Sequence, residues 1–110
     1  MSKASLYKGS LQTIILQLLQ ANGKMYGYEI TQKVKELTQD ELVLTEGALY
    51  PALHKLEAQG FLEVEVLEVA NRLRKYYKLT PAGVEESASK LEALLQFVEN
   101  MQLLTSKKLV

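Results

Sequence analysis

Hydrophobic periodicity switches from a helical spacing to a period of two in one segment of this chain, and the position of that segment limits the fold more than any other feature. In residues 61–69, apolar side chains alternate with glutamates, which is the period of two expected of a half-buried strand. Residues 72–79 follow a short turn and predict a second strand of the same hairpin. The alternating apolar residues of the first strand are Leu62, Val64 and Val66.

Two amphipathic helices are predicted ahead of the hairpin, in the first third of the chain. The first covers residues 10–21, where apolar side chains recur every three or four positions. Gly23 ends it, because glycine tolerates the positive φ of a helix terminus. The second covers residues 26–38. Its apolar stripe consists of Tyr26, Ile30, Val34 and Leu37.

A third helix is predicted from the N-cap residue Thr45 to Gln59, with Gly60 directly after its end. One side, which we expect in the core, carries Leu49, Ala52, Leu53 and Leu56. The opposite side carries Gly47, Pro51, His54 and Ala58, flanked by Tyr50 and Lys55. Pro51 removes a backbone donor and is expected to disturb the first turns. Either the distortion lets the backbone approach a partner closely, or it serves packing alone.

The last helix begins at Thr80 and Pro81, a capping residue followed by a proline. It extends to about residue 104 and is about 36 Å long, and its apolar residues recur at heptad-like steps. We expect this stripe to pair with the same helix, or the first helix, of a second copy. A helix that folds back onto its own domain is the alternative. The predicted dimer interface is Leu91, Leu94, Leu95, Val98 and Met101.

Composition removes several classes of function. The chain has 110 residues, no cysteine and one histidine, which excludes disulfides, cysteine nucleophiles and zinc sites built on thiolates or paired imidazoles. Thirteen basic and thirteen acidic residues give a net charge of zero, so attraction to a polyanion has to be local. No segment has the run of apolar residues that a membrane span needs. We therefore expect a cytoplasmic protein without metal, cofactor or membrane partner.

The order of the elements predicts the fold. Three helices, a hairpin and one long helix contain no strand-helix-strand crossover, so a parallel sheet is excluded. We predict a mainly α (α+β) protein: a winged helix-turn-helix with a long C-terminal dimerisation helix. Residues 1–80 would form the DNA-binding domain, with the third helix in the major groove and the hairpin as the wing. Residues 81–110 would form the dimerisation helix and tail.

Four blocks of sequence also resemble one known family. They are GKMYGYEI at residues 23–30, LTEGALYPAL at 44–53, KLE with GFL at 55–62, and YYKLTPAG at 76–83. In this order and spacing they resemble the PadR-like transcriptional regulators. The resemblance implies a dimeric DNA-binding winged helix, usually a repressor, of the compact subgroup with one helix after the wing. The short, glycine-free wing tip at residues 69–72 departs from many relatives and leaves its reach into the minor groove open.

The predicted DNA-binding surface combines the family positions with the one dense basic run. Arg72, Arg74, Lys75 and Lys78 lie in a stretch, residues 70–84, that contains no acid, and such cations neutralise phosphates. The alternative is that the glutamates of the first strand pair with them across the hairpin. A tyrosine and a histidine on the third helix can contact phosphates or base edges. The predicted residues are Tyr26, Tyr28, Thr45, Gly47, Tyr50, His54, Lys55, Arg72, Arg74 and Lys75.

The expected function is a dimeric, sequence-specific DNA-binding regulator, a repressor released by a small-molecule effector. Two recognition helices about 34 to 36 Å apart predict a near-palindromic operator. The alternative is a winged-helix protein-interaction module without sequence-specific DNA binding. An enzyme is not expected, because no nucleophile with a base and no phosphate loop is present. The resemblance implies a small aromatic effector; Tyr7, Phe97 and Met101 are candidate walls for it, but we assign no ligand-binding residue.

Overall fold

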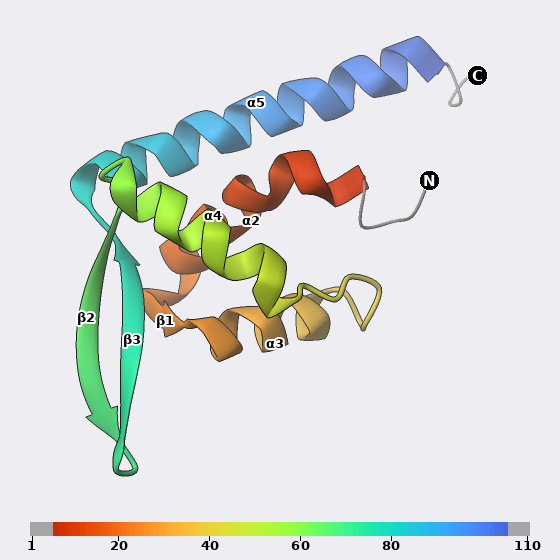
Figure 1. Ribbon diagram of the computed structural model, residues 1–110. Coiled ribbons are helices and arrows are strands. Elements are labelled where there is room, and N and C mark those ends of the chain that lie inside the picture. Colours follow the sequence, from red (N-terminus) through yellow and green to blue (C-terminus); the bar gives the residue numbers. More distant parts are fainter. Residues whose placement is uncertain (1–5, 106–110) are drawn as a thin grey trace.

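The computed structural model describes residues 6–105, and its element order is that of a winged helix (Figure 1). A 3-10 turn and two helices are interrupted by a short strand, and a hairpin separates the third helix from the last. The elements are η1 (Lys8–Ser10), α2 (Leu11–Asn22), β1 (Lys24–Tyr26), α3 (Gly27–Leu37), α4 (Glu46–Ala58), β2 (Leu62–Val69), β3 (Arg72–Leu79) and α5 (Pro81–Thr105).

Side-chain caps and glycines set the helix boundaries where the sequence predicts them. Thr45 Oγ1 accepts a hydrogen bond from the Ala48 N–H at 3.2 Å, and Thr80 Oγ1 accepts one from the Gly83 N–H at 3.0 Å. Gly23 and Gly60 follow the ends of α2 and α4 with φ of 84° each, a conformation that costs glycine no steric clash. These starts and stops are confirmed.

The sheet has three antiparallel strands in the order β1-β3-β2, whereas the sequence predicts a hairpin only. The additional strand is β1, which pairs Met25 with Tyr77. Tyr26 is therefore extended, with φ −97° and ψ 166°, and α3 begins one residue later than expected. Three residues are too short to show an alternating pattern, and their partner lies some fifty positions away in the chain, so the strand has no local signal.

The wing is the β2–β3 hairpin, closed by a two-residue turn. Ala70 and Asn71 both have positive φ, 53° and 64°, which is the geometry of a type I′ turn. Val69 consequently pairs with Arg72, and the register continues to Leu62 opposite Leu79. The tip extends away from the helices (Figure 1).

The core lies where α2, α3, α4 and the sheet meet. The largest fully buried side chains among residues 6–105 are Ile15, Leu16, Leu19, Ile30, Leu49, Leu53, Leu56, Tyr77 and Ser87. Two residues predicted on buried stripes are instead exposed: Leu37 at 65% and Val66 at 55%. Leu37 is the last residue of α3, and Val66 lies in the second half of β2, toward the wing tip. The wing tip projects beyond the helices (Figure 1). The apolar pattern of each element therefore extends beyond the part that packs against the core.

Helix α5 packs against the body along about its first half. Gln17 Nε2 of α2 donates to Ser87 Oγ at 2.8 Å and to the Ser87 carbonyl at 3.1 Å. A side chain at Gly83 would collide with the Phe61 carbonyl oxygen, so the helix crosses the β2 end closely. The last turns of α5 extend beyond α2 (Figure 1), and residues 95–105 are all exposed. No helix among residues 6–105 is long and apolar enough to cross a membrane.

The predicted dimer stripe divides along α5. Leu91 and Leu94 are half-buried. For this part of α5, their burial agrees with the alternative in which the helix folds back onto its own domain. Leu95, Val98 and Met101 are 59%, 43% and 41% exposed. The body of the same chain thus covers the first part of the stripe only.

Candidate nucleic-acid interface

Helix α4 has one buried and one exposed face, as predicted. Leu49, Leu53 and Leu56 are fully buried, whereas the opposite face is exposed. The helix is continuous from Glu46 to Ala58 through Pro51, so the predicted disturbance does not interrupt it. The exposed predicted site residues of this helix and its cap are Thr45, Gly47, His54 and Lys55.

Tyr50 lies between the buried and exposed faces of α4. It is half-buried, and its ring crosses to the start of α3, where a Cβ on Gly27 would collide with its hydroxyl. The ring of His54 lies 6.2 Å from the Tyr50 ring, centroid to centroid. Tyr50 therefore joins α4 to α3 and still reaches the surface. Gly27, which makes this contact possible, is a site residue that the sequence reasoning did not single out.

A surface hollow of about 330 Å³ brings the start of α3, α4 and the wing together. Six of the ten predicted DNA-binding residues line it: Tyr26, Tyr28, Tyr50, Arg72, Arg74 and Lys75. Gly27 and Leu73 complete the lining. Residues separated by more than forty positions in the sequence thus form one concave surface with three cations. The other four predicted residues lie outside this hollow.

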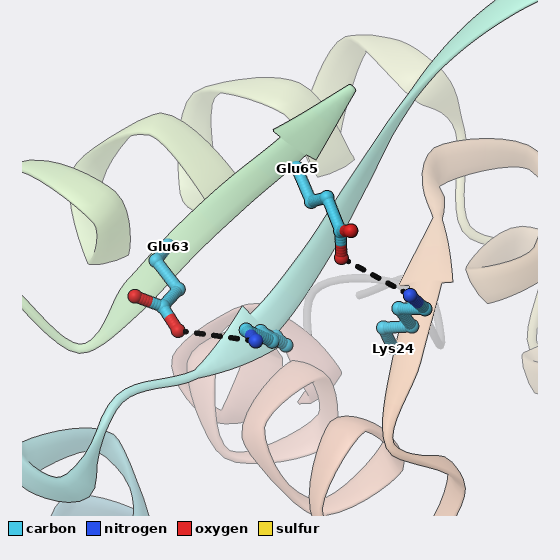
Figure 2. A network of polar contacts seen from close by, with 4 residues as sticks. Lys24, Glu63 and Glu65 are labelled. Carbon is cyan, nitrogen blue, oxygen red and sulfur yellow. Dashed lines mark hydrogen bonds and ion pairs between the residues drawn. The ribbon is translucent and has the colours of Figure 1, made fainter. Parts of the chain in front are cut away.

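Two of the three glutamates of β2 pair with lysines other than these three cations. Figure 2 shows Glu65 pointing to Lys24 of β1, and its second dashed line joins Glu63 to the partner that the ion pair identifies as Lys78. The ion pairs measure 3.5 Å between Lys78 Nζ and Glu63 Oε1, and 3.0 Å between Lys24 Nζ and Glu65 Oε1. Within residues 6–105, no ion pair involves Arg72, Arg74 or Lys75. Cross-hairpin pairing is therefore right for Lys78 and wrong for the other three.

Arg74 is held by an aromatic ring instead of a carboxylate. Its Cζ lies 4.3 Å from the centroid of the Tyr26 ring, within the range of a cation–π interaction. The ring of Tyr76 packs edge-on against the Tyr26 ring, with 5.3 Å between the ring centroids and 74° between the ring planes. The backbone N–H of Tyr26 donates to Glu29 Oε1 at 3.1 Å, which caps α3 and fixes this residue at the junction with β1.

Tyr76 and Tyr77 point to opposite sides of β3, as the alternation predicts. Tyr77 is fully buried, and burial raises its pKa above 10.0, with further contributions from Glu57 and Tyr50. Its phenol consequently stays neutral and serves packing. Neither tyrosine lines the basic hollow.

A second hollow, of about 290 Å³, is almost entirely apolar and lies beside the N-terminus of α4. Tyr7, Leu11 and Ile14 line one side, and the connector residues Leu42, Val43 and Leu44 line another. Thr45, the cap of α4, also borders it. Of the three predicted effector walls only Tyr7 contributes, and the connector was not predicted. The described residues contain no group of three or more side chains suited to a metal ion.

Known proteins share the sequence pattern and the overall fold. The family model of the transcriptional regulator PadR-like family matches residues 15–89, which is more than half of the chain. The chain belongs to the PadR-like family. The matched range contains the whole basic hollow and α4. Membership makes the protein a transcriptional regulator of a DNA-binding family.

Several known proteins are similar to this PadR-like protein in sequence or in structure. The transcriptional regulator Rv3488 of Mycobacterium tuberculosis is 41% identical over 63 residues, 57% of this chain and 56% of that protein. A transcriptional regulator from Clostridium thermocellum is 29% identical, with a TM-score of 0.79 over 96% of this chain and 99% of that chain. A PadR-like transcription factor from Bacteroides fragilis is 33% identical, with a TM-score of 0.66 over 90% and 96% of the two chains.

Proposed function

We propose that this PadR-like regulator binds a near-palindromic operator as a homodimer and represses transcription from it in the cytoplasm. The exposed face of α4 enters the major groove, and the wing lies beside it against the backbone. The observation that carries this proposal is the basic hollow, in which three cations without acidic partners adjoin the exposed face of the third helix. Cations of this kind release counterions when they neutralise phosphates.

The site residues divide by role in this proposal. Arg72, Arg74 and Lys75 contact phosphates from the wing. Along α4, Tyr50, His54 and Lys55 face bases or phosphates, and Gly47 leaves room for the DNA backbone. Thr45 and Tyr28 contact phosphates at the helix starts. Support comes from their exposure and from the common surface that most of them share.

Dimerisation is proposed through α5 of two copies. An exposed apolar stripe that includes Leu95, Val98 and Met101 lies on the part of α5, residues 95–105, that the body of its own chain leaves exposed. Pairing this stripe with α5 or α2 of a second copy removes it from water and gives a twofold symmetric dimer. Symmetry then places the two α4 helices at successive half-sites, which is why the operator is proposed to be near-palindromic.

We also propose that a small aromatic effector releases the operator. The apolar hollow supports this, because it is lined by apolar side chains and touches Thr45, which caps the recognition helix. A ligand that widened the gap between α2 and the connector would shift the start of α4. Its binding is measured by the rise in melting temperature with an aromatic acid series. Release is measured as weaker DNA binding with the ligand present.

The test uses duplexes selected by the protein from a random pool, with affinity measured by fluorescence anisotropy. The Arg72→Ala, Arg74→Ala double variant removes two cations from the hollow. Lys33→Ala, Lys90→Ala is the matched control, since it removes two cations from outside the hollow. We expect the first variant to lose at least about tenfold in affinity and the control to lose little. Equal affinities of both variants would reject the hollow as the DNA-binding surface.

A further inference from the structure

One cation of the basic hollow differs from the other two in how it is held. Arg74 lies over the face of Tyr26 and is half-buried. Among the described residues, no ring contact or ion pair holds Arg72 or Lys75. An arginine fixed before binding loses less conformational freedom when it contacts a phosphate than a freely moving one.

The Tyr26 ring is itself fixed from two sides. The backbone of Tyr26 pairs with Tyr76 in the sheet, and the Tyr26 N–H donates a hydrogen bond to Glu29 Oε1. The edge of Tyr76 packs against it at 5.3 Å. The short strand β1 therefore places one rigid aromatic face beneath the guanidinium at the border of the hollow.

We propose that Tyr26 is a positioning residue, whose ring face holds Arg74 ready for a phosphodiester of the DNA backbone. Its contribution comes from the π face and not from the hydroxyl. This inference rests on the proposed function and revises the direct DNA contact expected of Tyr26 from its sequence position. The guanidinium presents its N–H groups to the phosphate, while the ring stays on the protein side.

Two substitutions separate the ring from the hydroxyl. Tyr26→Phe keeps the aromatic face and removes only the hydroxyl, so its affinity for the selected duplex stays within about twofold of the unmodified protein. Tyr26→Leu removes the face and weakens binding by about two- to fivefold for each bound protomer. Urea unfolding of both variants shows whether the fold is retained. If the leucine variant does not fold, Tyr26→Met replaces it as an unbranched apolar side chain without a ring.

A double-mutant comparison separates positioning from a general structural effect. Once Arg74→Ala has removed the guanidinium, Tyr26→Leu causes no further loss of affinity, because the two residues act as one unit. Arg72 makes no ring contact with Tyr26. In an Arg72→Ala background, Tyr26→Leu therefore lowers the affinity by the same factor as it does in the unmodified protein. This second pair is the matched control.

Three outcomes overturn the inference while leaving DNA binding intact. Tyr26→Phe could weaken binding as much as Tyr26→Leu, which would assign the effect to the hydroxyl. Tyr26→Leu could bind as tightly as the unmodified protein. Tyr26→Leu could also lower the affinity of the Arg74→Ala variant by the same factor as it lowers that of the unmodified protein. Failure of the proposed function gives a different result, in which the unmodified protein selects no duplex at all.

Discussion

At the scale of single residues, Gly27 sets how closely α3 and α4 approach. Gly27→Ala places a methyl group against the Tyr50 hydroxyl, and overpacking of this kind costs about 1 to 3 kcal/mol of unfolding free energy. Adding Tyr50→Phe removes the hydroxyl and should restore part of that loss. Gly47→Ala is the control, because its nearest neighbour is 4.0 Å away and alanine favours the helix. Urea denaturation measures all three, and an unchanged Gly27→Ala midpoint would contradict the contact.

The buried phenol of Tyr77 predicts a pH dependence of stability. Burial raises its pKa above 10.0 in the folded chain, so the folded state favours the neutral phenol. Tyr77 therefore contributes its full share of the unfolding free energy below pH 10. This contribution is lost progressively as the pH rises from 10 through the raised pKa of the folded state. Tyr77→Phe should remove this part of the alkaline loss. Unfolding free energies at a series of pH values from 8 upward measure it, and identical alkaline slopes for both proteins would refute it.

At the scale of elements, the wing turn stores strain that a single substitution can release. Ala70 has φ of 53°, a conformation that costs a residue with a Cβ about 1 kcal/mol. Ala70→Gly is expected to raise the unfolding free energy by up to about this amount. Ala93→Gly within α5 should instead lower it by about 1 kcal/mol. Thermal unfolding compares the two, and a destabilised Ala70→Gly would show that the turn is unstrained.

The sequence predicts the elements whose signals are local, and fails where partners are distant. Thr45, Gly60 and Thr80 mark helix ends by capping chemistry that operates within a few residues. Strand β1 has no such signal, since it exists only through pairing with β3. The same applies to the site: the basic run is visible in the sequence, but its separation into a paired Lys78 and an unpaired Arg72 depends on strand register. The contact of Tyr50 with Gly27 is likewise a product of tertiary packing.

At the scale of the whole molecule, the proposed dimer depends on α5. Leu95→Glu, Val98→Glu places two charges on the exposed apolar stripe, and burying them in a dimer is strongly unfavourable. Light scattering should show a folded monomer for this variant and a dimer for the unmodified protein. Gln96→Glu is the control, because it adds a charge to α5 outside the predicted stripe. A dimer in all three proteins would place the interface elsewhere.

The neutral molecule binds DNA, in this account, through a local field that its overall charge conceals. Glu63 and Glu65 are occupied by Lys78 and Lys24, which leaves the wing cations to the DNA backbone. The salt dependence of operator affinity tests this claim most directly, because it counts neutralised phosphates. The Arg72→Ala, Arg74→Ala variant should lower the slope of log Kd against log salt by about 0.9 for each lost contact. A variant slope equal to that of the unmodified protein would contradict the account.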